Sequence, residues 1–260
     1  MNIVFYKYQG TGNDFIILDN REGKYNSLTK EQIARLCHRR FGIGADGLML
    51  LQLKKGYDFE MIYYNADGGE SSMCGNGGRC LVSFANKLGI IKTKAHFIAI
   101  DGEHEAELLT GGSVKLKMQD VSAIERGKDY TLLNTGSPHC VVFKPGIKEL
   151  DVYTEGKKIR YSNRFAEKGV NVNFVESEPG NLFVRTYERG VENETLSCGT
   201  GVTAAAIAAS KDDIKIECLT NVSTPGGNLN VQFDKLDDYT FRNVYLIGPA
   251  NLVFEGTISI

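Results

Sequence analysis

The chain of 260 residues contains no tryptophan, only five prolines and no run of 18 or more apolar residues. Without such a run no membrane-spanning helix is expected, and residues 1–7 have the composition of a strand instead of a secretory signal peptide. Lysine and arginine (30) nearly balance aspartate and glutamate (32), so there is no general attraction for nucleic acid or anionic lipid. We therefore expect a cytoplasmic protein that binds a small molecule, and neither nucleic acid nor a membrane.

The six cysteines include no Cys-x-x-Cys pair. In a chain without a secretory signal, reduced thiols are expected more than a disulfide framework, and Cys74 and Cys80 are too widely spaced for a zinc knuckle. We predict no metal site. Four cysteines stand among apolar or helical residues, where a cysteine usually acts as a small hydrophobe: Cys37, Cys80, Cys140 and Cys218.

One phrase occurs twice in the chain. The first copy is Glu70-Ser-Ser-Met-Cys74-Gly-Asn-Gly77 and the second is Glu194-Thr-Leu-Ser-Cys198-Gly-Thr-Gly201, so the two cysteines lie 198 − 74 = 124 positions apart. The same offset relates residues 11–13 (Thr-Gly-Asn) to residues 135–137 (Thr-Gly-Ser). This pattern indicates a duplication in which each half presents one cysteine in a glycine-rich turn.

Short strand-like runs dominate both halves, and the last of them covers residues 243–260. Helical patterns are expected at residues 29–40, 76–87 and 200–210, so each repeated cysteine precedes a helix. We predict an α+β protein of two pseudo-symmetric domains, each a curved, mostly antiparallel sheet or barrel around a central helix. The expected first domain is 1–119, joined by the last strand at about 247–260, and the second is 120–246. The helix N-termini are expected to converge on a cleft between the domains.

A thiol at a helix N-terminus lies near backbone N–H groups that favour the thiolate, and the same groups suit a substrate carboxylate. Gly75 and Gly199 allow a ligand to approach the backbone closely. Two such thiols could act on opposite faces of one carbon, which is what inverting a stereocentre requires. A single Cys-Gly-x-Gly is as readily an ordinary helix-opening turn, but its duplication at a fixed offset favours the functional interpretation.

A second motif, Gly42-Ile-Gly44-Ala-Asp-Gly47, matches the Gly-x-Gly-x-x-Gly dinucleotide fingerprint in letters only. It follows an expected helix and precedes an expected strand, the reverse of the Rossmann order. No phosphate-binding Gly-x-x-x-x-Gly-Lys is present either. We predict chemistry without a cofactor.

With these residues in hand, the chain resembles the diaminopimelate epimerase family. The matching phrases span its whole length: Gly12-Asn-Asp-Phe15, Gly42-Ile-Gly-Ala-Asp46, Tyr64-Asn-Ala-Asp-Gly68, Met73-Cys-Gly-Asn-Gly-Gly-Arg-Cys80, Gly136-Ser-Pro-His139, Val170-Asn171, Glu188-Arg-Gly190, Cys198-Gly-Thr-Gly201 and Pro225-Gly-Gly227. The resemblance implies an isomerase of lysine and cell-wall precursor biosynthesis. Such an enzyme interconverts LL- and meso-diaminopimelate without a cofactor and has two pseudo-symmetric α/β domains.

The resemblance also implies residue roles. Cys74 and Cys198 would be the acid-base thiols, and His139 and Glu188 would tune them. The implied substrate contacts are Asn13, Asn65, Gly75, Asn76, Asn171, Glu188, Arg189, Gly199 and Thr200. Arg189 is a natural bidentate partner for the distal carboxylate.

The chain departs from the family pattern at three places. Gly47 stands where many relatives carry glutamine, Ser137 stands where many carry asparagine, and the segment between Glu188 and Cys198 is one residue longer than usual. Gly47 has no side chain and Ser137 a shorter one, so both supply fewer or shorter contacts to the substrate than glutamine and asparagine would.

Other functions stay open at this level. A proline or hydroxyproline racemase shares the two-cysteine plan but usually carries histidine where this chain has Asn76. A thiol hydrolase would pair Cys74 or Cys198 with His139, and an amino-acid-binding or redox-sensing protein would need no catalysis. Without the resemblance, the asparagines would be read as turn formers and Glu188–Arg189 as a solvated ion pair. The sequence leaves a homodimer open.

Overall fold

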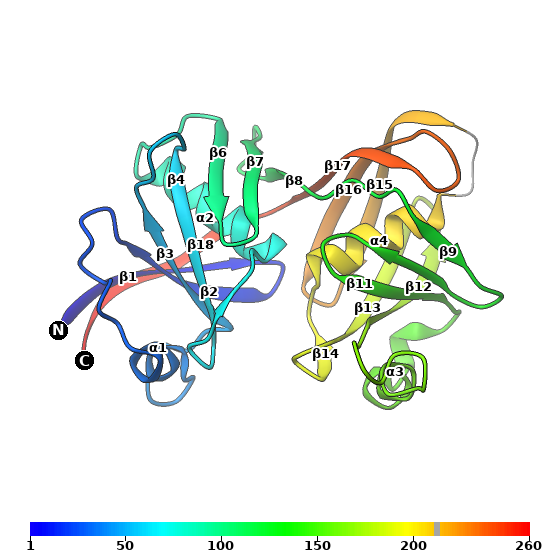
Figure 1. Cartoon of the computed structure of the whole chain (residues 1–260), viewed down its shortest axis with the longest axis horizontal. Helices are drawn as coiled ribbons and strands as arrows, with labels where there is room; N and C mark the ends of the chain where they lie inside the picture. Colours follow the sequence, from blue (N-terminus) through cyan, green and yellow to red (C-terminus); the bar gives the residue numbers. More distant parts are fainter. Residues whose placement is uncertain (211–213) are drawn as a thin grey trace. The chain divides into compact units, whose positions relative to one another are not determined.

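The computed structural model describes residues 1–210 and 214–260, which form two compact units. The first unit consists of Met1–Leu116 together with Gly248–Ile260, and the second of Lys117–Ile247. Figure 1 shows the two termini beside each other in the first unit. There β1 (Asn2–Gly10) pairs antiparallel with β18 (Asn251–Ser259), and the Ile260 N–H donates to the Met1 carbonyl at 3.0 Å.

The first unit holds two helices, α1 (Lys30–Cys37) and α2 (Gly75–Lys87). Its other strands are β2 (Asn13–Asp19), β3 (Gly47–Gln52), β4 (Phe59–Asn65), β5 (Glu70–Ser71), β6 (Lys94–Ala99), β7 (Gly102–Leu108) and β8 (Val114–Lys117), which ends at the boundary. Helix α2 packs against β1, β2, β3, β4 and β7 (Figure 1). Ten of its 13 residues are buried, so it forms the centre of the unit.

The second unit repeats this plan with α3 (Val152–Arg160), α4 (Gly199–Ala209) and the 3-10 helix η1 (Ile147–Glu149). Its strands are β9 (Ile124–Arg126), β10 (Thr131–Asn134), β11 (Pro138–Phe143), β12 (Asn171–Glu178), β13 (Asn181–Glu188), β14 (Asn193–Thr195), β15 (Lys215–Thr224), β16 (Gly227–Lys235) and β17 (Phe241–Gly248). The alanine-rich α4 is the central helix, because its small residues let β10 to β13 and β16 approach closely. No helix in the described part of either unit is both long and apolar enough to cross a bilayer.

The repeat seen in the sequence is present in the strand register. In the first unit β2 and β3 pair in parallel with Phe15 opposite Gly47, and in the second β11 and β12 pair in parallel with His139 opposite Asn171. Both partners are shifted by 124 positions, as are the first residues of α2 and α4. The predicted α+β class with two pseudo-symmetric halves is therefore confirmed.

Several local expectations were wrong. Helix α1 ends at Cys37 and not near residue 40, because the N–H groups of Ile43 and Gly44 take the Leu36 carbonyl and turn the chain back. Helix α3, which opens on the Asp151 side chain, was not expected. The final run is two strands, β17 and β18, and not one. Cys218 is only half-buried, whereas the other three cysteines expected in the core are buried.

Helix α4 has a tighter packing constraint than its counterpart. A Cβ at Gly201 would lie 2.3 Å from Asn173 Oδ1, whereas a Cβ at the equivalent Gly77 would lie 3.2 Å from the flexible Met49 Sδ. We expect Gly201→Ala to destabilise the protein by about 1–3 kcal/mol, because the clash outweighs the gain of roughly 1 kcal/mol in helix propensity. Gly77→Ala is the matched control and should change the urea midpoint little. Equal midpoints for the two variants would contradict this packing argument.

Candidate active site

Cys74 is the N-cap residue of α2, with extended backbone angles (φ −93°, ψ 130°), and its side chain does not cap the helix. Its thiol instead donates to Asn13 Oδ1 at 3.6 Å, and Asn76 Nδ2 donates to the same oxygen at 3.3 Å. Gly75 and Asn76 are buried in the first turn of the helix. The structure therefore brings four predicted site residues together at one helix start.

Sequence reasoning missed Arg79, which orients this group. Arg79 is fully buried, and its Nη1 donates to Asn76 Oδ1 at 3.0 Å and to the Gly75 carbonyl at 3.3 Å. Its Nη2 donates to Thr11 Oγ1 at 3.3 Å. Burial lowers the pKa of Arg79 from its ordinary value. The signal in the sequence is an arginine among mostly small and apolar helix residues, because its partner Thr11 lies on another segment.

Cys198 occupies the equivalent N-cap of α4 and is buried. Its sulfur lies 3.4 Å from Thr200 Oγ1, and Thr135 Oγ1 donates to the Thr200 carbonyl at 2.8 Å. Gly199 is also buried at this helix start. Because the first N–H groups of a helix point out of its N-terminus, each cysteine stands beside a site suited to a carboxylate.

Comparison with known proteins identifies the chain. The diaminopimelate epimerase family model matches residues 5–124 and 131–253, which together are most of the chain. The chain belongs to the diaminopimelate epimerase family. It is 51% identical over 254 residues to a diaminopimelate epimerase of Flavobacterium psychrophilum, with 97% of this chain and 99% of the relative covered. It is 45% identical to one of Chlorobaculum tepidum, with 96% and 99% covered.

Solved structures at low identity share the fold of this epimerase family. A phenazine biosynthesis protein of the PhzF family from Bacillus anthracis superposes with a TM-score of 0.71 at 15% identity over the full length of both chains. A probable proline racemase from Agrobacterium radiobacter superposes with a TM-score of 0.72 at 16% identity, covering 99% of this chain and 92% of that one.

In this member of the diaminopimelate epimerase family, a polar pair lies under the start of α4. His139 and Asn173 are buried, and Asn173 Nδ2 lies 3.0 Å from His139 Nδ1. Thr186 Oγ1 donates to Asn173 Oδ1 at 3.0 Å, so the amide nitrogen faces the imidazole as a donor. The proton of the neutral ring is then on Nε2, which has no partner among the described residues. The equivalent positions in the first unit are the apolar Phe15 and Met49.

Burial and the nearby Arg189 cation lower the pKa of His139 from 6.5 to about 3, although the bond to Asn173 opposes this shift. The ring is therefore neutral near pH 7 and can act there as an Nε2–H donor. It cannot carry a proton as an imidazolium at that pH. Any influence of His139 on a thiol must come from this donor or from packing.

The depressed pKa predicts an acid-labile contribution to stability. The unfolded chain binds a proton on His139 below about pH 6.5 and the folded chain does not, so stability falls as the pH drops from about 6.5 toward 3. His139→Gln, which can still bond Asn173, should show a smaller fall in urea midpoint between pH 7 and pH 4.5 than the wild type. An identical fall in both proteins would contradict the assignment.

Asn171, Ser137 and Arg189 form a connected group. Asn171 Nδ2 donates to Ser137 Oγ at 2.7 Å, and Asn171 Oδ1 accepts from the Arg189 backbone N–H at 2.8 Å. Ser137 therefore orients Asn171. The Arg189 side chain is exposed, and its Nη1 donates to the Lys168 carbonyl at 3.0 Å. A cavity of about 780 Å³ in the second unit is lined by both His139 and Arg189.

The remaining predicted residues are placed as follows. Glu188, at the end of β13, accepts from Thr195 Oγ1 at 2.9 Å. Asn65 is exposed at the end of β4.

The glycine at position 47 is explained by packing, because a Cβ there would lie 2.5 Å from Tyr63 Cε2. The buried tyrosine ring thus occupies the space into which a side chain at position 47 would extend.

Proposed function

We propose that this chain interconverts LL- and meso-diaminopimelate by a two-base mechanism without a cofactor, with Cys74 and Cys198 as the acid-base pair. The observation that carries the proposal is the duplication: each cysteine is the N-cap of the central helix of its unit, at the same position of the repeat. The names of the relatives supply the substrate.

In the forward step one cysteine thiolate removes the α-proton, so the C–H bond breaks and its electron pair is delocalised into the neighbouring carboxylate. The other thiol then gives its proton to the opposite face of the same carbon, which inverts the centre. The helix N-termini at Gly75 and Gly199 would stabilise the charge that develops on the carboxylate. The enzyme ends with the two sulfurs in exchanged protonation states, ready for the reverse reaction.

Recognition of the substrate follows the expected contacts. Arg189 would bind the distal carboxylate, with Asn171 held next to it by the Arg189 backbone N–H. Glu188 would accept from an ammonium group. The remaining proposed contacts are Asn13, Asn65, Gly75, Asn76, Gly199 and Thr200.

A cysteine-histidine hydrolase is disfavoured by the histidine itself. Such an enzyme needs an imidazole that takes a proton from the thiol near neutral pH. His139 has a pKa of about 3 and is buried, with Nδ1 occupied by Asn173.

A substrate panel tests the proposed function. The purified protein is incubated with LL-diaminopimelate, lysine, proline and hydroxyproline, and the stereoisomers are separated by chiral chromatography. We expect a mixture of LL- and meso-diaminopimelate and little change in the others. Faster inversion of proline or hydroxyproline would favour the racemase alternative.

We also propose a cytoplasmic location and a homodimer for this enzyme. Sedimentation velocity on the purified protein measures the second of these directly, since a monomer of 28.7 kDa and its dimer separate well.

A further inference from the structure

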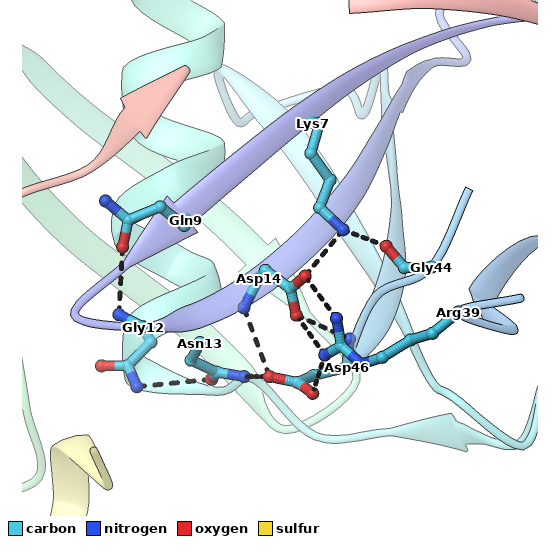
Figure 2. Close-up of polar contacts among 9 residues, drawn as sticks. Lys7, Gln9, Gly12, Asn13, Asp14, Arg39, Gly44 and Asp46 are labelled. Carbon is cyan, nitrogen blue, oxygen red and sulfur yellow. Dashed lines mark hydrogen bonds and ion pairs between the residues drawn. The ribbon is translucent and has the colours of Figure 1, made fainter. Parts of the chain in front are cut away.

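The Asn13 amide is held at both ends (Figure 2). Its Nδ2 donates to Asp46 Oδ2 at 2.5 Å, while its Oδ1 receives the Cys74 thiol at 3.6 Å and Asn76 Nδ2 at 3.3 Å. Asp46 belongs to the glycine-rich segment 42–46 that precedes β3, for which the proposed chemistry has no role. Within the described part of the chain, Asp46 is the carboxylate that accepts from the Asn13 side chain.

Asp46 is itself held in a fixed position. Its Oδ2 also accepts from the Asp14 N–H at 3.3 Å, and its Oδ1 accepts from Arg39 Nη2 at 2.7 Å. Its own N–H donates to Asp14 Oδ1 at 3.1 Å. The segment before it is tied to the end of α1, where the Ala45 N–H donates to the Cys37 carbonyl at 3.0 Å.

The cations Arg39 and Lys7 balance the negative charges of Asp14 and Asp46. Arg39 donates to both oxygens of Asp14, and Lys7 pairs with Asp14 at 2.7 Å and donates to the Gly44 carbonyl. Burial raises the pKa of Asp14, but the hydrogen bonds from Arg39 and Lys7 outweigh it and lower the pKa to about 2. Asp14 is therefore an anion near neutral pH and holds both cations in the arrangement of Figure 2.

The polarity of the Asn13 amide follows from these contacts. A carboxylate accepts hydrogen bonds and cannot donate them when ionised, so Asp46 requires the amide nitrogen on its side. The amide oxygen must then face Cys74. Arg79 favours the same orientation of the Asn13 amide from the other side. It donates to Asn76 Oδ1, so Asn76 Nδ2 faces the Asn13 oxygen.

We propose that Asp46 is a positioning residue that holds the Asn13 oxygen against Cys74 and thereby keeps Cys74 protonated in the free enzyme. The roles of the two thiols follow if the proposed function holds. In the first turnover of the free enzyme, Cys74 is then the acid and Cys198 the base. An oxygen acceptor stabilises the S–H form, whereas an N–H donor in the same place would stabilise the thiolate.

Other charged or titratable groups also act on Cys74. Arg79 and Cys80 lie on its own helix, and Asp101 accepts from the Met73 N–H next to it at 3.2 Å. The carboxylates of Asp14 and Asp46 and the cations Lys7 and Arg39 lie on the other side of Asn13. The N-terminus of α2 and Arg79 favour the thiolate, whereas Asp101 and the acceptor oxygen of Asn13 favour the protonated thiol.

The test is the pH dependence of Cys74 alkylation. Iodoacetamide is added to the intact protein from pH 5.5 to 9.5, and modification of the Cys74 peptide is followed by mass spectrometry. In Asp46→Asn, the carboxylate that accepts from Asn13 Nδ2 becomes an amide that must also meet Arg39 and the Asp14 N–H, so the Asn13 oxygen is no longer held against the thiol from that end. We expect the midpoint of the curve to fall by about one pH unit, and alkylation at pH 7 to become several-fold faster.

Three comparisons complete the test. In an Asn13→Ala background, Asp46→Asn should cause no further shift, because its effect passes through Asn13. Asp19→Asn, which removes an arginine-paired carboxylate from the other end of β2, should leave the midpoint unchanged. Asp46→Ser, which also removes the carboxylate, is measured if the asparagine variant does not fold, and its midpoint should fall as well.

An unchanged midpoint in the folded Asp46 variants would overturn the proposal. So would a shift of the same size in the Asn13→Ala background, since Asp46 would then act through its charge alone. The measurement needs no diaminopimelate. If the alkylation midpoint shifts as expected but the protein does not epimerise diaminopimelate, the role of Asp46 is supported and only the proposed function is refuted.

Discussion

Replacement of either Cys74 or Cys198 by alanine should abolish net conversion of LL- to meso-diaminopimelate. One face of the α-carbon then has no group that can remove or deliver a proton, and loss of one general acid or base costs roughly 10²–10⁴-fold or more. The measurement is initial velocity by chiral chromatography. Cys218→Ala is the matched control, because this half-buried thiol on β15 lies at no helix start and should be dispensable.

The remaining thiol should retain part of the chemistry. A single-cysteine variant can still remove a proton from the face that its sulfur reaches and return one to the same face. Such a variant should exchange the α-hydrogen of one stereoisomer with solvent but not invert it. Near wild-type epimerisation by Cys198→Ala would falsify the two-base mechanism.

Arg189→Ala should lower kcat/KM for diaminopimelate by about 100-fold or more. The distal carboxylate would lose a charge-assisted partner worth a few kcal/mol, and the groups that surround it would be left unsatisfied. Lysine, which lacks that carboxylate, should be a very poor substrate of the wild type for the same reason. The rate at which Cys74 and Cys198 are alkylated should not change in the variant.

Arg242→Ala provides the control for that variant, because Arg242 is an exposed arginine on β17 in the same unit. Its kcat/KM should equal that of the wild type. A near-normal kcat/KM for Arg189→Ala, or comparable racemisation of lysine by the wild type, would show that the distal head is recognised elsewhere.

The sequence predicted the features that recur in both halves of the chain. It did not predict side chains whose role depends on residues far away in the sequence. The fixed offset of 124 positions identified both N-cap cysteines and the two halves, and the parallel register of Phe15 with Gly47 and His139 with Asn171 follows the same offset. Helix α3 was missed because its pattern is short, with two buried residues among nine. Its single strong signal is the capping side chain of Asp151.

The supporting side chains could not be identified for a different reason. Asp46 and Asn173 act through hydrogen bonds to residues on other segments, and Arg79 bonds Thr11 as well as its own helix. No local pattern marks an aspartate, asparagine or arginine as such a partner. The resemblance gave His139 a tuning role. The low pKa that limits this role follows from complete burial, which only the fold reveals.

The central claim is that two thiols act on opposite faces of one carbon, and isotope exchange tests it most directly. LL-diaminopimelate is incubated with the wild-type enzyme in heavy water, and the reaction is stopped at low conversion. Configuration and α-deuteration are then read together by chiral chromatography and mass spectrometry. With separate donor and acceptor thiols, the meso product should carry deuterium at the inverted carbon from the first turnover, while the recovered LL substrate remains largely unlabelled. Meso product that retains the original hydrogen, or substrate labelled as fast as product forms, would indicate one base serving both faces and would contradict the account.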